Sequence, residues 1–239
     1  MTGQRGAALL VVLWVLALLG TLLAGVASLV HLQNRQALWQ SQQARGIAIA
    51  EAGVALAVEA LTRRDLRSRW PSDGRVQTQR FDDAELRITV RSERGKLDLN
   101  SAMSSDFARL FQACGADVGA ARQLAAQLDR RRAAETPLRM LEELRELPGM
   151  SQALYGCAEP YVTVWSGETR PLAELAAPLL ARALNMAQAR GIQSAVGQTF
   201  TITSRVRLSS GHDSRLRVTL MMNSTKEGAR PYRVLRWQE

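Results

Sequence analysis

The sequence has few of the residues from which catalytic and metal centres are usually built. Its two cysteines are Cys114 and Cys157, and its two histidines, His31 and His212, lie far apart without a clustered carboxylate. It contains no glycine-rich phosphate loop and no cysteine–histidine spacing typical of a metal centre. We therefore expect no enzymatic activity, no catalytic residue and no required cofactor, and we interpret both histidines as surface residues.

Lysine is also nearly absent, so the formal charge of +9 over 239 residues comes almost wholly from arginine. A positive excess is typical of proteins that bind nucleic acid or acidic lipid. The arginines are scattered along the chain, however, and the longest basic run is Arg130-Arg131-Arg132 on an expected helix. The pattern favours a solvated basic surface.

The N-terminus contains a long segment without charge. From Ala7 to Val30 the chain runs 24 residues without a charged side chain, which as a helix is about 36 Å long and sufficient to cross a hydrocarbon core of about 30 Å. A secretory signal cleaved after Gly25-Val26-Ala27 is the alternative, but its apolar region usually spans only about 7–15 residues. The length predicts an uncleaved anchor, and Arg5 before it favours a globular part outside the cytoplasm.

Beyond the apolar segment the helical pattern continues. One apolar stripe recurs at steps of three and four residues, and it consists of Ile47, Ala50, Val54, Ala57 and Leu61. The helix is expected to end near Arg63, before a loop at residues 70–74.

Alternation of apolar and polar residues predicts strands at 75–81, 86–90, 200–208 and 216–222, and a last short strand that starts at Tyr232 and ends near Trp237. The region between the second and third of these strands is mostly helical, with helices expected at 106–113, 117–134 and 137–148 and a fourth capped by Ser151. Asn100 and Ser101 are also good helix-capping residues. The predicted fold class is α+β: a long N-terminal helix packs on a small antiparallel sheet, which is interrupted by a large helical insertion domain.

The junction at Gly6 resembles the class III signal of type IV pilin-like proteins. In that family a prepilin peptidase cuts after the glycine of a short basic leader, and the new N-terminus, here Ala7, is methylated. Most members have a glutamate at the fifth mature position, which is Val11 in this chain. In having an apolar residue at that position, the chain resembles the K minor pseudopilins of type II secretion.

Two further stretches resemble the K minor pseudopilins. Residues 94–102, Arg-Gly-Lys-Leu-Asp-Leu-Asn-Ser-Ala, are similar to a Gly-Lys-Leu-Asn-hydrophobic-Asn-x-Ala pattern that opens the helical insertion, with Asp98 in place of the first asparagine. Residues 143–165 contain the Glu-Leu, Pro-Gly-Met, Tyr and Pro-Tyr-Val-Thr-Val elements. A later Asn-x-Asn-x-Ala-Pro element keeps only Ala177-Pro178.

The resemblance implies a domain organisation. It comprises a leader peptide at 1–6, a transmembrane helix at 7–30, the periplasmic half of the long helix at 31–63, a pilin-like sheet domain in two parts at 64–97 and 195–239, and a helical insertion domain at 98–194. The chain would be a single-pass protein of the bacterial inner membrane, with its globular part in the periplasm.

The resemblance also implies a function. A K minor pseudopilin lies at the tip of the type II secretion pseudopilus and helps to initiate its assembly, for export of folded proteins across the outer membrane. The implied partners are the minor pseudopilins I and J in a tip complex, with H as a further candidate, the prepilin peptidase and the inner-membrane assembly platform, without nucleic acid.

Two site assignments stay open at the level of sequence. In an oxidising compartment, Cys114 and Cys157 can form one disulfide or remain two separately buried thiols, because the sequence does not reveal their Cα distance. The acidic pairs Asp82-Asp83 and Glu142-Glu143 are either solvated carboxylates or ligands for Ca²⁺, which K pseudopilins bind. No metal ligand can be assigned residue by residue.

An alternative function uses some of the same residues. Residues 97–102 and 146–150 resemble halves of the helix-hairpin-helix modules of membrane-anchored DNA-binding proteins from competence systems, in which hairpin glycines bring backbone amides to DNA phosphates. Here only Gly149 is present, because Ser151 occupies the second glycine position, and three glutamates lie nearby. These differences favour the pseudopilin over the DNA-binding protein.

Overall fold

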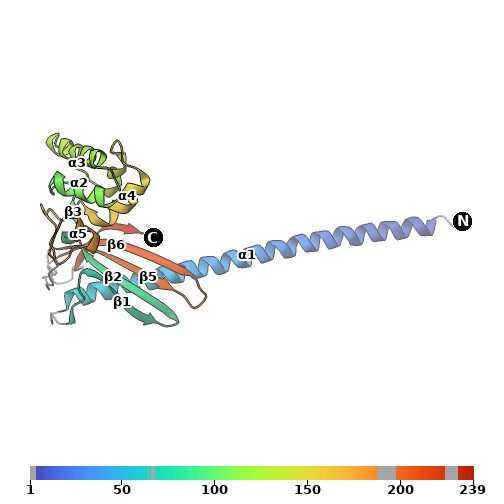
Figure 1. Cartoon of the computed structure of the whole chain (residues 1–239). Helices are drawn as coiled ribbons and strands as arrows, with labels where there is room; N and C mark the ends of the chain where they lie inside the picture. Colours follow the sequence, from blue (N-terminus) through green and yellow to red (C-terminus); the bar gives the residue numbers. More distant parts are fainter. Residues whose placement is uncertain (1–3, 64, 66–67, 188–197, 224–230) are drawn as a thin grey trace.

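The computed structural model describes residues 4–63, 65, 68–187, 198–223 and 231–239. A long helix, α1 (Gln4–Thr62), packs its C-terminal part on a five-stranded antiparallel sheet, and its N-terminal part extends away from the sheet (Figure 1). The predicted α+β class is confirmed, and so is the end of the long helix near Arg63. Among the helical residues described, no helix is both long and apolar enough to cross a membrane.

The sheet has the strand order β1-β2-β5-β6-β7, and every neighbouring pair is antiparallel. Its strands are β1 (Asp73–Phe81), β2 (Ala84–Ser92), β5 (Thr199–Arg207), β6 (Asp213–Met222) and β7 (Tyr232–Gln238). All five predicted strands are confirmed, with bounds that differ by a few residues. The apolar residues of the alternating pattern, such as Leu86, Ile88 and Ile202, form one core with α1.

The predicted apolar stripe of α1 faces the sheet, although Ile47 lies at its edge and Ile49 is buried in its place. Two glycines allow this close approach. A Cβ added to Gly46 would overlap the hydroxyl of Ser214 on β6 and lie 2.9 Å from its Cβ, and a Cβ added to Gly53 would lie 3.2 Å from the Cβ of Ser204 on β5. The helix therefore lies against the sheet because these two positions carry no side chain.

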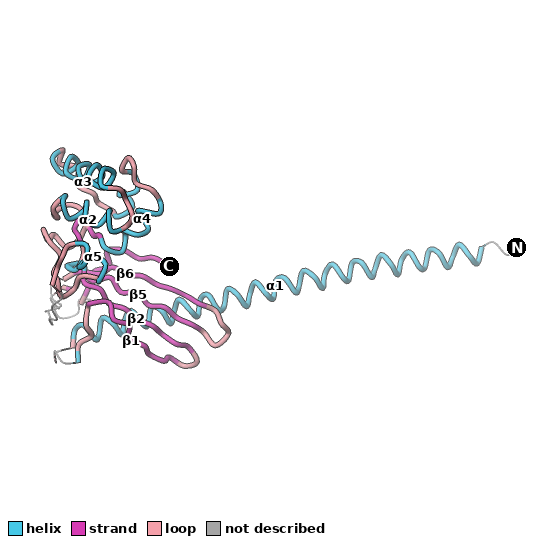
Figure 2. Tube along the Cα trace, in the orientation of Figure 1, coloured by secondary structure: helices cyan, strands magenta, loops and turns pink. Residues whose placement is uncertain are grey.

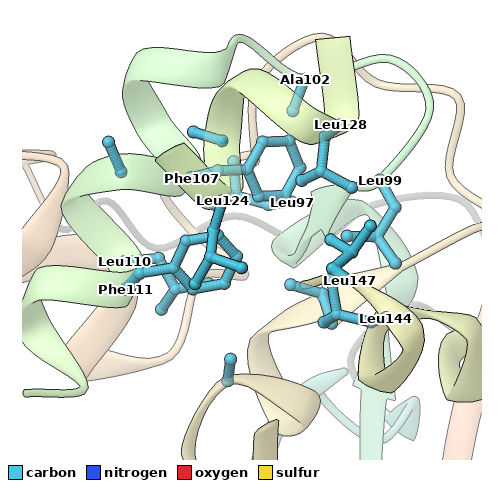
Figure 3. Packing of buried hydrophobic residues seen from close by; sticks show 14 of the residues in the cluster. Leu97, Leu99, Ala102, Phe107, Leu110, Phe111, Leu124, Leu128, Leu144 and Leu147 are labelled. Atoms are coloured by element: carbon cyan, nitrogen blue, oxygen red, sulfur yellow. The ribbon is translucent and has the colours of Figure 1, made fainter. Parts of the chain in front are cut away.

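The helical insertion follows β2 and returns at β5, and Figure 2 shows its helices gathered at one end of the sheet. Its elements are η2 (Glu93–Gly95), β3 (Leu97–Asp98), α2 (Ser104–Ala113), α3 (Val118–Ala133), η3 (Leu141–Glu146), α4 (Gln152–Ala158), η4 (Glu159–Tyr161), β4 (Val162–Thr163) and α5 (Pro178–Ala183). It has its own apolar core, in which Phe107, Phe111 and Leu124 are almost fully buried (Figure 3). The insertion therefore folds around a core separate from that of the sheet.

One predicted helix is wrong. Residues 137–148 do not form an α-helix, and only the 3₁₀ segment η3 (Leu141–Glu146) is present. The reason is local hydrogen bonding: Oε1 of Glu143 accepts the backbone N–H groups of Arg139 and Met140, and the side chain of Asn100 binds the backbone of Leu138. These contacts hold residues before Leu141 outside a helix. The short strands β3 and β4 and helix α5 were not predicted, and the domain limits expected at 64 and at 194 and 195 lie outside the described residues.

Candidate functional site

The three N-terminal residues singled out by sequence lie together near the start of α1. Gly6, Ala7 and Val11 belong to one continuous helix, at the end remote from the sheet (Figure 1). The same helix reaches the sheet core at Ala50 and Ala57, which are fully buried. The expected cleavage position and the globular part are therefore joined by one helix, while the cleavage itself stays a prediction.

The two turns nearest the extended part of α1 hold the helix where it leaves the sheet. In the β1–β2 turn, Asp82 binds Arg45 of α1 at 2.8 Å, and Asp83 also pairs with Arg45. In the β5–β6 turn, Nε2 of His212 lies 3.0 Å from Oε1 of Gln43, and its ring meets that of Trp39 edge-on. These contacts fix the direction in which α1 extends from the globular part.

The structure places His212 against α1 as a half-buried contact residue, which the interpretation as a simple surface histidine missed. His31 is exposed on α1. The position of His212 follows from pairing of β5 with β6, which brings residues far apart in the chain to the same turn. No local sequence pattern marks such a contact.

The acidic pairs proposed as calcium ligands form ion pairs with arginines. The hydroxyl of Ser209 donates a hydrogen bond to Asp83, and this bond is the largest cause of the lowered pKa of Asp83. Burial acts in the opposite direction and raises the pKa, while Arg45 lowers it further. Burial raises the pKa of Glu143, but the backbone N–H groups of Arg139 and Met140 and the charge of Arg131 outweigh this effect and leave the pKa lowered.

Glu142 pairs with Arg236 of β7, and Oε2 of Glu143 lies 3.1 Å from Arg131. In the described ranges there is no group of three histidine, cysteine or acidic side chains placed to hold a metal ion. The acidic pairs therefore connect elements of the fold in this structure.

Asp98, which departs from the family pattern, binds a cluster of hydrogen-bond donors. It is 2% exposed. Its Oδ2 accepts the backbone N–H groups of Ser166 and Gly167, at 3.0 and 2.8 Å, and the Ser166 hydroxyl at 3.2 Å, while Oδ1 accepts the N–H of Asn100. A carboxylate has acceptors on both oxygens, whereas an asparagine amide would turn two donors toward some of these groups. Aspartate therefore suits this position better than asparagine.

Asn100 does not cap a helix, contrary to expectation, because the N-cap residue of α2 is Met103. Its side chain instead makes two hydrogen bonds to the backbone of Leu138. Together with Asp98, it joins the opening of the insertion to segments 38 and 68 residues away in the chain. The motif that resembles the family pattern has a structural role here.

Cys114 and Cys157 form a disulfide with a Cα–Cα distance of 5.7 Å. Cys114 follows α2 and Cys157 lies in α4, so the bond links two helices of the insertion across 43 residues of sequence. Of the two arrangements that the sequence left open, the structure contains the bridged one.

The helix-hairpin-helix alternative is not supported. Leu97 and Asp98 form strand β3, and residues 99–102 form a turn, where the module requires a helix. Gly149 lies in the turn between η3 and α4 with φ of 93°.

Sequence reasoning missed one feature of the sheet. Arginines that are scattered in the chain come together on the face opposite α1, around a cavity of about 350 Å³. Each of them stands at an alternate position of its strand, a spacing that is common in any half-exposed strand. Only the pairing register brings them together.

No family model matches the sequence, and no curated protein matches it either. Among solved structures, the fold is similar to that of a chain in the crystal structure of the GspK-GspI-GspJ complex from the enterotoxigenic Escherichia coli type 2 secretion system. The TM-score is 0.51 at 16% sequence identity, and the match covers 86% of this chain and 96% of that chain. The predicted resemblance to type II secretion pseudopilins is therefore matched by a similar fold over most of the chain.

Proposed function

We propose that the chain is a minor pseudopilin of a type II secretion system, located at the tip of the pseudopilus, where it helps to initiate assembly. The observation that carries the proposal is the position of the helical insertion: it interrupts a pilin-like helix-and-sheet domain between β2 and β5. A chain of the GspK-GspI-GspJ complex has a similar fold over 96% of its length. The role is structural, without catalysis and without a required cofactor.

The proposed site of action is the bacterial inner membrane. In this proposal the prepilin peptidase cleaves after Gly6, Ala7 becomes the methylated N-terminus, and residues 7–30 are anchored in the bilayer with the globular part in the periplasm. The uncharged segment from Ala7 to Val30 supports the anchor. The continuity of α1 supports it as well, because anchor and sheet-packing part then belong to one helix.

Val11 supports the position at the tip. A carboxylate within a bilayer costs roughly 2.5–3.5 kcal/mol on insertion scales, so a glutamate there requires a partner such as the N-terminal amine of the next subunit. This chain has an amine at Ala7 but an apolar residue at Val11. It can therefore be held by a subunit below it, and it has no carboxylate with which to hold one above.

The insertion supports the same position. It forms a lobe with its own apolar core at one end of the sheet (Figure 2). Such a lobe would crowd neighbouring subunits along a fibre, whereas the tip leaves it free space. We propose I and J minor pseudopilins as its partners there, with H as a further candidate, and the inner-membrane platform as the site of assembly.

The test combines secretion with position. In the bacterium that encodes the chain, deletion of its gene should leave exoproteins in the periplasm, and the wild-type gene should restore their release. Tagged protein should co-purify with I and J, and immunogold labelling should mark one end of isolated fibres.

The Val11→Glu variant should label the tip less selectively, with Val12→Leu as a control on the same helix. Unchanged secretion in the deletion strain, or labelling along the whole fibre by wild-type protein, would contradict the proposal.

A further inference from the structure

The face of the sheet opposite α1 contains a row of three arginines on adjacent strands. In the pairing register, Arg87 of β2 is opposite Arg205 of β5, which is opposite Arg215 of β6. These strands lie side by side (Figure 1). The residues that alternate with the arginines, such as Ile88 and Leu216, are buried in the core with α1, so the arginines project from the other face.

More donors lie farther along the same strands. Two residues beyond the arginine row, Thr89 is opposite Thr203, which is opposite Arg217, and two residues beyond that Arg91 is opposite Thr201. This face therefore presents guanidinium groups and hydroxyl groups in successive rows.

The rows line two cavities that share residues. The first, of about 350 Å³, is bounded on one side by Pro160 and Trp165 of the insertion, and the second has a volume of about 360 Å³. Arg87, Arg205 and Arg215 line both cavities. The two cavities thus form one groove across the arginine row, with an apolar wall at the end near the insertion.

Half of the basic side chains that line this groove are neutralised by acidic side chains of the chain itself: Lys96 pairs with Glu93, and Arg207 pairs with Asp213 at the end of the groove where Glu85 also lies. Arg217 pairs with Glu159 at 3.0 Å, and Arg236 lies 3.7 Å from the same carboxylate. Within the ranges that the structure describes, Arg87, Arg91, Arg205 and Arg215 form no salt bridge. Like charges directly opposite on neighbouring strands destabilise a sheet.

The neighbouring charges affect Arg215 directly. Burial is the largest cause of a lowered pKa for Arg215, followed by the charges of Arg217 and Arg205. The sheet therefore holds its guanidinium groups in an arrangement that costs free energy in the absence of a ligand, and an anionic ligand would offset this cost.

We propose that this arginine groove binds an extended acidic segment of a partner protein. Arginine forks bind carboxylates through hydrogen bonds from their N–H groups, so the guanidinium groups of one row can together hold one carboxylate. Side chains on one face of an extended segment recur about every 6.8 Å, which is also the spacing of the successive rows along β5 and β6. The length of the groove over two cavities suits several carboxylates in series better than one small anion. This site goes beyond the proposed tip role, because its binding does not depend on position in a fibre.

The test measures binding of the full chain, in a non-ionic detergent, to a fluorescein-labelled eight-residue peptide of alternating glutamate and threonine. The matched peptide has glutamine in place of glutamate. Fluorescence anisotropy should report binding of the glutamate peptide that weakens as sodium chloride is raised, and at least tenfold weaker binding of the glutamine peptide. Equal binding of the two peptides would refute the proposal.

Variants locate the site. The double variant R205Q/R215Q should bind the glutamate peptide at least tenfold more weakly. The matched double variant R122Q/R130Q removes the same charge from exposed positions on α3 and should change binding less than twofold. The single variant R87Q should give an intermediate loss. Equal losses in the two double variants would show attraction by net charge alone and refute the site.

Two further measurements distinguish the groove from other anion sites and from misfolding. If an oligothymidine of equal charge binds more tightly than the glutamate peptide, the ligand is a nucleic acid and not an acidic polypeptide. If equimolar inorganic phosphate displaces the peptide, the groove is a small-anion site. Either result would overturn the proposal. The melting temperature of R205Q/R215Q should be equal to or above that of the wild type, because a repulsion is removed. If the melting temperature of R205Q/R215Q falls, the single variant R87Q tests the site in its place, provided that its own melting temperature is unchanged. Unaltered peptide binding by R87Q would then overturn the proposal.

Discussion

Asn100 and Leu138 exchange two hydrogen bonds across 38 residues of sequence. Oδ1 of Asn100 accepts the N–H of Leu138 at 2.9 Å, and Nδ2 donates to the Leu138 carbonyl at 2.8 Å. Leu138 itself is 2% exposed. The side-chain amide thus satisfies both polar groups of a buried residue in the way a neighbouring strand would.

The first prediction concerns this contact. Asn100→Ala should lower the free energy of unfolding by about 1–3 kcal/mol, because two buried backbone groups lose their partner. Urea denaturation followed by circular dichroism measures the change. Gln112→Ala, at an exposed position of α2, is the control and should stay within about 0.5 kcal/mol. Equal effects of the two substitutions would show that the pair contributes nothing specific.

The second prediction concerns the disulfide between Cys114 and Cys157. Denatured, unreduced protein should show no free thiol on quantitative labelling, and two after reduction. Cys114→Ser/Cys157→Ser should be less stable by about 2–4 kcal/mol, because the bond constrains the unfolded chain between α2 and α4. Two reactive thiols before reduction would contradict the bridge.

The third prediction is a pH dependence that involves Glu143. Its pKa is lowered from the usual value of 4.5 in the folded protein. A carboxyl with a depressed folded pKa stabilises the fold above its unfolded pKa and loses this contribution as the pH falls through the folded pKa. The stability of the wild type should therefore fall more steeply below about pH 4.5 than that of Glu143→Gln. Urea titrations at a series of pH values test this.

Glu146→Gln provides the matched control for Glu143, because it makes the same charge change at an exposed position three residues away. Its stability profile should run parallel to that of the wild type. Parallel profiles for wild type and Glu143→Gln would show that hydrogen bonds from Arg139 and Met140 do not favour the carboxylate.

The fourth prediction concerns the approach of α1 to the sheet. Gly46→Ala should lower stability by about 1–3 kcal/mol, because the added Cβ would lie 2.9 Å from the Cβ of Ser214 and the helix must shift. Gly156→Ala in α4, where the added carbon has no neighbour within 4 Å, should be neutral or stabilising. Thermal unfolding compares the two. A Gly46→Ala protein as stable as the wild type would show that the helix can move from the sheet without cost.

The fifth prediction concerns processing. N-terminal sequencing and mass spectrometry of protein from the native host should find Ala7 as a methylated first residue, because the short basic leader ends at Gly6. Gly6→Leu should block cleavage, whereas Gly20→Leu in the apolar segment should not. A mature chain that begins at Ser28, or an intact Met1, would contradict cleavage after Gly6.

Local periodicity was sufficient to predict α1, the five strands of the sheet and the helical character of the insertion. Steps of three and four residues place Ala50, Val54 and Ala57 on one helix face, and alternation places Leu86 and Ile88 on one strand face, whatever lies opposite. These patterns express a requirement for burial along a single element, and they can therefore be read from the sequence alone.

Only the tertiary structure decided what depends on two distant segments. Glu143 and Asn100 hold residues 138–140 out of a helix that local signals favour, and strand register assembles Arg87, Arg205 and Arg215 from positions up to 128 residues apart. The pairing of Cys114 with Cys157 depends on the packing of α2 and α4 in the same way. The sequence alone determined α1, the strands of the sheet and most of the other helices, because burial along a single element is a local requirement. The pairing of strands and the packing of helices decided which side chains meet, because hydrogen bonds and ion pairs require proximity in space.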